Sequence, residues 1–443
     1  MGVGGTKLIT ASLLSMLVLV SWGLCPSRGL AAERPGASAA SDSATELSPF
    51  LYTAIDGHKE TLVPWQGQHV SVLVEPGPVR DPVVMSELVA ALDRAWSYYA
   101  ATTGRLPGVA HSLNGRDEIA EVTSTCGAGC TYLGATGTEI LTQYFETLYQ
   151  QVAQSKLYDQ VAFYELGRSF WFWSPQLAFK APDQDPVVTG FAVLMRFRSM
   201  AAAGVAGAPY NGAPFTTFAA GVEALAREYE ADPSLTFAGT LAQAKSPGAY
   251  GGTDFWASLM LQLAGRHGGQ IFLTRFFHHA GSLPAASSTP GAVTNWVRDA
   301  SYAACTDLAP VFYARWGFPR PDGSVTPRPT AASVPEPPGS CTTLSAGRAH
   351  VKRGKAGVLL TCVGVPGARC KLTLVLTVRR ATRGRVVGIG RHTLAAGRSE
   401  AVRVRLNRTG RRLLAVRHHL RATLTVTELG GYGAPVIRRR VTF

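Results

Sequence analysis

Charged residues are scarce in this sequence, and the motifs that define several large enzyme classes are missing. Of the 443 residues, 16% are charged and 46% are hydrophobic, which is typical of a globular protein and excludes a largely disordered one. No HxxEH, GxSxG or P-loop motif occurs, so the sequence lacks the signatures of inverted zinc peptidases, α/β-hydrolases and P-loop NTPases. Beyond residue 24 no apolar run is long enough to span a membrane.

The first 32 residues have the pattern of a secretory signal peptide. Lys7 supplies a positive start, residues 8–24 form an apolar stretch, and small residues at 29–32 fit a signal peptidase. We expect cleavage there, followed by an Ala/Ser/Pro-rich flexible leader over residues 33–48. An uncleaved anchor is the alternative, because the apolar stretch approaches the roughly 20 residues that span a bilayer. In both cases the protein is predicted to be secreted or associated with the cell surface.

Cysteine is rare, and its distribution favours disulfide bonds. The sequence has seven cysteines, of which Cys25 lies within the signal peptide. The remaining six are an even number in an exported protein, which indicates bridges more than a metal site. Other pairings stay open from sequence alone. Short spacing and elimination favour three pairs: Cys126–Cys130, Cys362–Cys370 and Cys305–Cys341.

The net charge of +14 belongs to one end of the chain. Residues 348–443 hold 22 Lys or Arg against two Glu, a net of +20. Everything before them holds 21 basic and 27 acidic residues, a net of −6. The C-terminal region is therefore a distinct, strongly basic unit.

The hydrophobic pattern changes along the chain from strands to helices and back to strands. Alternation predicts strands between residues 50 and 75 and over 118–123, and Asp81 before Pro82 predicts a helix start. This order predicts an α+β fold for residues 49–319, a helix-rich domain with an N-terminal sheet. Helical spacing predicts helices near 142–154, 157–173, 187–203, 214–230, 253–266, 269–280, 289–303 and 306–316.

Residues 320–340 are rich in proline and predict a stiff linker. Beyond them, residues 341–443 alternate with period two, as in the segment CKLTLVLTV that starts at Cys370. About seven short strands fit this region, which predicts an all-β sandwich.

The segment VAFYELGRSFWFW, residues 161–173, carries most of the functional information. Zinc peptidases place HExxH on a helix, where two His on one face bind the metal and the Glu activates water. In the gluzincins a third ligand, Glu, comes from the next helix, often within NEGFA. Here the next helix contains VTGFA at residues 188–192, so the frame resembles the gluzincins. The resemblance puts Glu165 at the catalytic-base position and Tyr164, Arg168 and Thr189 at the ligand positions.

Those three residues are poor zinc ligands. Arg is cationic and offers no lone pair, a phenol with a pKa near ~10 is protonated, and Thr has a neutral hydroxyl. We interpret Arg168 as filling the place of the metal and pairing with Glu165, three residues earlier. The resemblance then implies a zincin-like fold with an inactivated site, a vestigial Glu165 and no cofactor. A plain helix-surface pair, or an active site of another kind, remains an alternative.

The end of the helical region supports the same frame. Residues 308–312 (LAPVF) and 316–319 (WGFP) are similar to the closing helix of enhancin-like zinc peptidases, which act on mucin-type glycoproteins. This resemblance covers residues 70–320 and implies a cleft for peptide or glycan.

Further candidates are aromatic. Tyr164 is expected to face the cleft, and Tyr210 and Asn211 to border it. The run at residues 170–173 fits a sugar-stacking platform, but core packing is the favoured interpretation. The adjacent His278 and His279 point to different sides of a helix, so they are not expected to chelate a metal.

The C-terminal region resembles an immunoglobulin-like module of proteins secreted by GC-rich actinobacteria, over residues 358–362 (VLLTC) and 370–378. Its arginines alternate with apolar residues, which predicts one strongly positive sheet face. Anionic cell-wall polymers or acidic glycans are the predicted partners, and no motif for specific nucleic-acid recognition occurs. Alternatively, the arginines only protect exposed strand edges.

The sequence thus favours a secreted or cell-surface, non-catalytic protein that binds peptide or glycan and is tethered by a cationic sandwich. An active extracellular hydrolase that uses Glu165 with other residues is the second reading. A purely structural cell-surface protein is the third. The sequence does not specify an oligomeric state.

Overall fold

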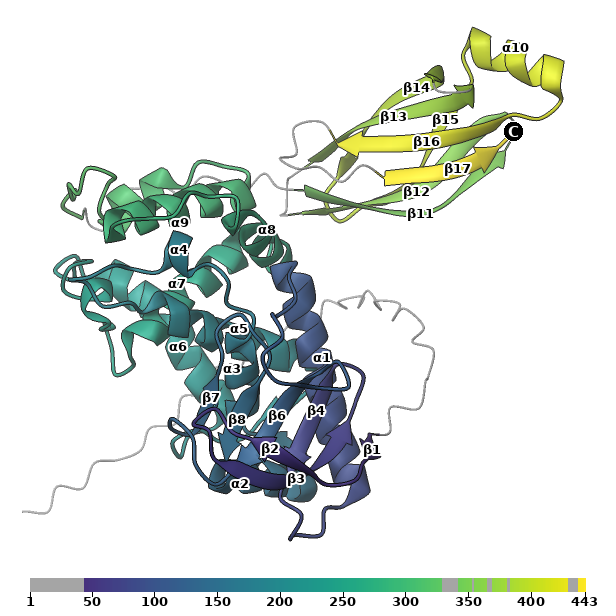
Figure 1. The fold of residues 1–443 in the computed structure, drawn as a ribbon. Coiled ribbons are helices and arrows are strands. Elements are labelled where there is room, and N and C mark those ends of the chain that lie inside the picture. The colour runs from purple at the N-terminus through teal and green to yellow at the C-terminus, as the bar shows by residue number, and fades with distance from the viewer. Residues whose placement is uncertain (1–43, 329–341, 353, 365–368, 381–382, 429–436) are drawn as a thin grey trace, which may run out of the picture. The chain divides into compact units, whose positions relative to one another are not determined.

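A computed structural model describes residues 44–328, 342–352, 354–364, 369–380, 383–428 and 437–443. Within them, a mixed α+β N-terminal region precedes a C-terminal region of antiparallel sheets (Figure 1). The predicted fold class is therefore confirmed. The expected signal peptide, residues 1–32, lies outside the described residues, as does most of the expected leader.

The N-terminal region is built on an eight-stranded mixed sheet with the order β1-β3-β4-β6-β8-β7. The pairs β4–β6 and β6–β8 are parallel and the others antiparallel, with β2 on β3 and β5 on β6. Strand β1 lies within the stretch predicted as a flexible leader, so that prediction ends too late. The strands are β1 (Thr45–Glu46), β2 (Phe50–Thr53), β3 (Lys59–Gln66), β4 (Val70–Val74), β5 (Ser112–Leu113), β6 (Arg116–Val122), β7 (Gly129–Thr131) and β8 (Thr138–Leu141).

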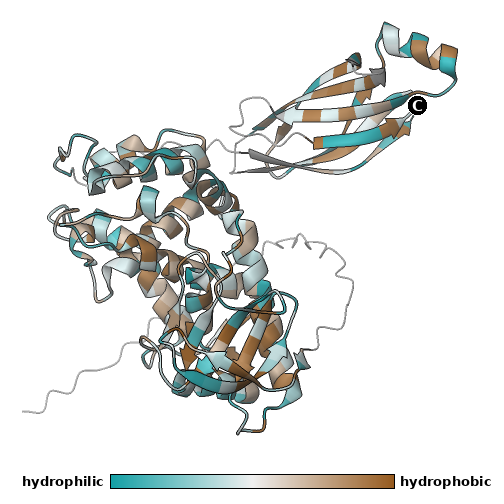
Figure 2. Cartoon of the chain, in the orientation of Figure 1, coloured by the Kyte–Doolittle hydropathy of each residue, from teal (hydrophilic) through white to brown (hydrophobic). Residues whose placement is uncertain are grey.

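Helix α1 (Pro82–Thr103) packs against this sheet and begins where the sequence predicts. The Asp81 side chain accepts a hydrogen bond from the Val83 N–H at 2.8 Å, and Pro82 occupies the first turn. The helix ends at Gly104, whose φ of 67° favours glycine. Its buried face joins β4 and β6 in the main hydrophobic core, and Figure 2 shows apolar residues concentrated on these strands.

Eight further helical segments complete the described N-terminal region, and six of them, α2 and α5 to α9, match their predicted ranges closely. A short parallel pair, β9 (Leu157–Tyr158) and β10 (Ala206–Gly207), lies among them. The segments are α2 (Thr142–Ser155), α3 (Val161–Arg168), α4 (Ser174–Leu177), α5 (Val187–Ala203), α6 (Phe215–Ala231), α7 (Gly252–Arg266), α8 (Gln270–Ala280) and α9 (Thr289–Ala304). Two further short helices are present. The 3-10 helix η1 (Leu241–Gln243) lies between α6 and α7 in the sequence, and the π-helix η2 (Pro310–Arg315) follows α9.

The predicted helix over 157–173 is too long at both ends. Residues 157 and 158 form β9, and α3 ends at Arg168 because Phe170 and Trp171 donate their N–H groups to the carbonyls of Gly167 and Arg168. The chain then turns so that three aromatic side chains enter the core. Phe170, Trp171 and Trp173 are all buried, so core packing is the role of this aromatic run.

The closing WGFP segment belongs to the core of the N-terminal region. Trp316 is buried, its indole donates to Glu230 at 2.9 Å, and its carbonyl accepts from Tyr229 at 2.8 Å. The predicted linker starts later than residue 320, because Arg328 donates to the backbone carbonyls of Leu235 and Asp232. The rest of the predicted linker, residues 329–340, lies outside the described residues.

The C-terminal region has its own core between two antiparallel sheets, β11-β12-β15 and β14-β13-β16-β17. Figure 2 shows apolar and hydrophilic residues alternating along these strands. Helix α10 (Arg408–Arg417), which Asn407 caps, was not predicted. The strands are β11 (Thr342–Lys352), β12 (Lys355–Gly364), β13 (Arg369–Arg380), β14 (Arg383–Ala395), β15 (Ser399–Arg405), β16 (Arg421–Glu428) and β17 (Ile437–Thr442).

Two predicted disulfides are confirmed. Cys126–Cys130 closes a loop before β7, and Cys362–Cys370 joins one strand of each C-terminal sheet. Cys305 is also disulfide-bonded, and its predicted partner Cys341 lies outside the described residues. Bridges of this kind are typical of extracellular proteins. Among the described residues, no helix is both long and apolar enough to cross a membrane.

Strand β6 contains buried carboxyl groups that make stability depend on pH. Burial raises the pKa of Asp117 from 3.8 to about 7, although one oxygen accepts from the Gly137 N–H at 2.9 Å. Burial likewise raises the pKa of Glu118 from 4.5 to about 7. The folded state therefore holds protons that the unfolded state releases between pH ~4 and ~7, so stability must fall as pH rises through this window.

We expect the free energy of unfolding to fall by about 1 kcal/mol per pH unit per group between pH 5 and 7. Urea unfolding monitored by tryptophan fluorescence measures it. Asp117→Asn should reduce this slope, because the amide does not titrate, whereas the surface variant Glu87→Gln should keep it. Stability that stays level or rises from pH 5 to 7 would contradict this assignment.

Candidate functional site

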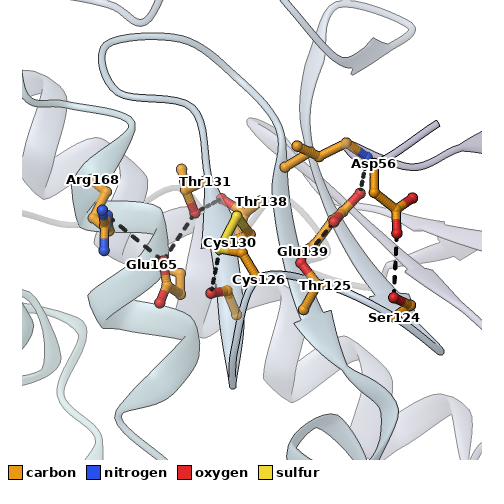
Figure 3. The surroundings of a disulfide bond; sticks show 12 residues. Asp56, Ser124, Thr125, Cys126, Cys130, Thr131, Thr138, Glu139, Glu165 and Arg168 are labelled. Carbon is orange, nitrogen blue, oxygen red and sulfur yellow. Dashed lines mark hydrogen bonds and ion pairs between the residues drawn. A yellow bond between two sulfur atoms is a disulfide. The ribbon is translucent and has the colours of Figure 1, made fainter.

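Glu165 lies on α3 under strand β7, at the edge of the sheet. Its side chain is buried, with 5% of the residue exposed. Its Oε2 accepts a hydrogen bond from the Thr131 hydroxyl at 3.3 Å and lies 3.9 Å from Nε of Arg168 (Figure 3). Strand and helix approach so closely that a Cβ on Gly129 would stand 2.8 Å from Cγ of Glu165. Only glycine fits at that point of β7.

The Cys126–Cys130 loop holds β7 in this position. The disulfide brings the two Cα atoms to 5.4 Å, and the Ala128 carbonyl accepts from the Leu141 N–H at 3.0 Å. Two carboxylates lie on either side of the loop, Glu165 towards α3 and Glu139 towards the sheet (Figure 3). Glu139 accepts from the Thr125 hydroxyl at 2.8 Å. The loop is therefore anchored from both sides and forms one wall of the site.

The charge state of Glu165 results from opposed effects. Burial raises its pKa above the ordinary value, while the Arg168 guanidinium and the Thr131 hydroxyl lower it. Burial also raises the pKa of the Tyr164 hydroxyl, and Arg168 opposes this shift as well. Arg168 thus opposes the effect of burial on the pKa of Glu165, although burial has the larger effect.

A cleft of about 660 Å³ opens beside Glu165, between α3, α5, α6 and the start of α7. Four of the residues predicted from sequence line it: Tyr164, Glu165, Tyr210 and Asn211. Arg168 is paired with Glu165 as predicted but is not part of the lining. Thr189 is half-buried on α5, one turn before the lining residue Val193, and is also outside the lining.

A residue that sequence analysis did not predict, Arg196, organises the cleft. It is buried on α5 and donates from Nη1 to Oε1 of Gln160 at 2.8 Å and from Nη2 to Oδ1 of Asp254 at 3.2 Å. Burial lowers its pKa and Asp254 raises it. Its sequence signal is a single cation within the apolar segment VLMRF of a helix. Four aromatic rings surround the guanidinium carbon at 4.7–5.8 Å, those of Tyr164, Phe197, Tyr210 and Phe218.

The rim of the cleft is formed by a tight turn that the sequence marks with Asn-Gly. Tyr210 and Ala213 exchange both backbone hydrogen bonds, at 2.8 and 3.0 Å. Between them, Asn211 and Gly212 have φ values of 48° and 77°, as a two-residue hairpin turn requires. This turn holds the Tyr210 ring 4.5 Å from that of Phe218 and leaves the Asn211 side chain exposed at the rim.

The third tyrosine that lines the cleft is Tyr250. Its ring centroid lies 5.9 Å from that of Phe218. The position is possible because α6 has glycine at 221, where a Cβ would come within 2.1 Å of the Tyr250 hydroxyl. Tyrosine rings therefore face the cleft from α3, from the 210–213 turn and from the segment before α7.

The histidines noted in the sequence are occupied elsewhere. His279 binds Asp299 through Nδ1 at 2.5 Å and stacks on Tyr302, with ring centroids 3.9 Å apart. His278 is exposed and contacts the Ala101 carbonyl at 3.2 Å. In the part of the chain that the structure describes, no group of three or more His, Cys, Asp or Glu side chains is placed to hold a metal ion.

Neither a protein-family model nor a curated protein matches this chain. Among solved structures, it is similar to a β-glucosidase, DesR from Streptomyces venezuelae in complex with D-glucose. That similarity covers 23% of this chain and 15% of the other, at 17% identity and a TM-score of 0.15. The chain thus matches a small part of that enzyme, and a likeness of this size supports no statement about fold or activity.

We expect Arg196→Met to lower the free energy of unfolding by about 3 kcal/mol, because it removes a buried cation and leaves the half-buried Asp254 without its partner. Asp254→Asn should have a smaller cost, and the double variant should cost less than the sum of the two. Arg227→Met, an exposed arginine on α6, is the control and should change stability by less than about 0.5 kcal/mol. Urea unfolding gives all four values, and strictly additive effects would refute the coupling.

Proposed function

We propose that this is an extracellular, non-catalytic protein that binds peptide or glycan in the cleft beside Glu165, on a zincin-like scaffold. One observation carries the proposal: the Arg168 guanidinium pairs with the Glu165 carboxylate, at the position where the gluzincin resemblance puts a zinc ligand. A permanent cation has no lone pair for Zn²⁺ and repels it. The carboxylate that would activate water is thus paired with a side chain.

The composition of the cleft supports ligand binding. Small-molecule sites are concave and largely apolar, with few polar groups that orient the ligand. Here the tyrosine rings supply the apolar surface, and Gln160, Asn211 and Asp254 supply hydrogen-bonding groups. Flat rings suit the C–H faces of sugars as well as the side chains of a peptide. Because Arg196 holds Gln160 and Asp254 in place, the polar groups are arranged before a ligand arrives.

A second candidate function is an extracellular hydrolase that uses Glu165 with another acid of the cleft. It is favoured by the burial that raises the pKa values of both Glu165 and Asp254, since raised pKa values in a cleft are typical of acid–base catalysts. Both shifts also have a structural explanation, because each carboxyl group has an arginine partner. Binding without catalysis therefore remains the favoured function.

The first test concerns zinc. The protein, incubated with Zn²⁺ and then dialysed, should retain far less than one zinc per chain by mass spectrometry of the metal. Replacing Tyr164 and Arg168 by His and Thr189 by Glu puts three zinc ligands at the frame positions. Zinc binding by this variant would support the zincin-like scaffold, and its absence would count against it, because Arg168 and Thr189 lie outside the cleft lining. Arg168→Ala alone is the control and should bind none. Stoichiometric zinc in the parent protein that Glu165→Ala removes would refute the proposal.

The second test concerns the ligand. Arrays of peptides and neutral oligosaccharides should give binders whose affinity falls about tenfold or more in Tyr164→Ala and Tyr210→Ala, since each loses a ring of the cleft. Tyr144→Ala, on the outer face of α2, is the matched control and should bind like the parent. Equal affinity in all variants would exclude the cleft, and turnover of a binder would favour the hydrolase.

For the C-terminal β region we propose a tethering function towards an anionic cell-wall polymer or glycan. The net charge of +20 over residues 348–443 supports it, because such a surface attracts polyanions at long range. Base stacking contributes little here, since residues 342–443 contain two aromatic side chains of the Phe, Tyr and Trp type, Tyr432 and Phe443.

A further inference from the structure

The three-stranded sheet of the C-terminal region places like charges directly opposite one another. Its strand register pairs Lys352 with Lys355, and Lys355 with Arg405. The neighbouring residues in each strand, Val351 and Val404 among them, pack towards the core. Side chains alternate along a strand, so the three cations share the outer face of the sheet.

A second row runs beside the first on the same face. His350 is opposite Gly357, which is opposite Arg403. Gly357 leaves space that both neighbours approach: a Cβ there would stand 3.0 Å from Nε2 of His350 and 3.5 Å from Cγ of Arg403. We call the four cations of the two rows, Lys352, Lys355, Arg403 and Arg405, together with His350, the cation ladder.

The cation ladder has no carboxylate partner among the residues that the structure describes. The acidic side chain described in this region, Glu400, binds Nε2 of His392 at 3.2 Å. Like charges directly opposite in a sheet are destabilising. Four of these residues are exposed and Lys355 is half-buried, so the fold gains little from them. Because this arrangement of cations does not stabilise the fold and is accessible, it fits a surface that binds a negatively charged partner.

The geometry points to a linear acidic polysaccharide as the partner of the cation ladder, an inference that rests on the tethering function proposed above. Strands lie ~4.8 Å apart, and residues two apart along a strand lie ~7 Å apart. The ladder is therefore a regular array whose cations can meet successive carboxylates along one extended chain. The first row contains the guanidinium of Arg405 and the ammonium groups of Lys352 and Lys355. A guanidinium can donate two parallel hydrogen bonds to one carboxylate, whereas an ammonium group acts as a point charge.

Two other polyanions fit this face less well. Single-stranded nucleic acid is held by aromatic stacking, for which this region has almost no rings. A membrane surface needs buried apolar area in addition to cations, whereas the large apolar side chain opposite Ala401 on this face, Leu359, stands alone among charged and small residues. Disulfides also indicate an extracellular partner.

The test compares two variants of the full chain that lose the same number of charges. The ladder variant changes Lys352, Lys355, Arg403 and Arg405 to Gln. The control variant changes four exposed arginines of α10 to Gln, at positions 408, 411, 412 and 417. Binding to immobilised polygalacturonate is measured over a series of salt concentrations.

We expect the ladder variant to bind about tenfold or more weakly than the parent, with a flatter salt dependence, because fewer counterions are released. The control variant should stay within about threefold of the parent. The melting temperature of the ladder variant should equal or exceed that of the parent, because like-charge repulsion is removed.

Each other outcome overturns part of this inference. Equal weakening in both variants would show that net charge, and not the ladder, binds the polymer. A ladder variant that binds like the parent would refute the ladder while keeping the tethering function. A parent that binds no polyanion would refute the tethering function itself. Tighter binding of the parent to duplex DNA, inorganic polyphosphate or phosphatidylglycerol vesicles would refute the polysaccharide as partner.

Discussion

The close approach of β7 to α3 is the constraint on which the rest of the N-terminal region depends. Gly129 permits it, the Cys126–Cys130 bridge maintains it, and it buries the Glu165 carboxylate. A buried carboxylate must gain a partner or lose its charge. Arg168 is that partner, three residues later on the same helix.

A second pair of an arginine and a carboxylate lies at helix α5. Arg196 is a buried cation on α5, and its charge is balanced by Asp254 and sheltered by aromatic rings. Two arginine–carboxylate pairs thus support the cleft, one within α3 and the other between α5 and α7. Such pairs add little net stability compared with an apolar core. What they provide is a defined arrangement of polar groups around the cavity.

The arginine and lysine side chains have different neighbours in the two regions of the chain. In the N-terminal region the buried arginines Arg80 and Arg196 each face a carboxylate. In the C-terminal region the exposed cations of the ladder face one another. Burial makes an uncompensated charge prohibitive in the first case, whereas water and salt reduce its cost in the second. Only the second arrangement leaves a charge that is free to attract a partner.

Local sequence signals determined much of this protein by themselves. Asp81-Pro82 and Gly104 define α1, alternating residues define the C-terminal strands, Asn211-Gly212 defines a turn, and short spacing indicated two disulfides, because these features depend on neighbours along the chain. The tertiary structure alone decided that α3 stops at Arg168, that Thr189 lies outside the cleft and that Arg196 lies within it. Those facts depend on the crossing of α3, α5 and α7, and sequence separation carries no information about which side chains such a crossing brings together.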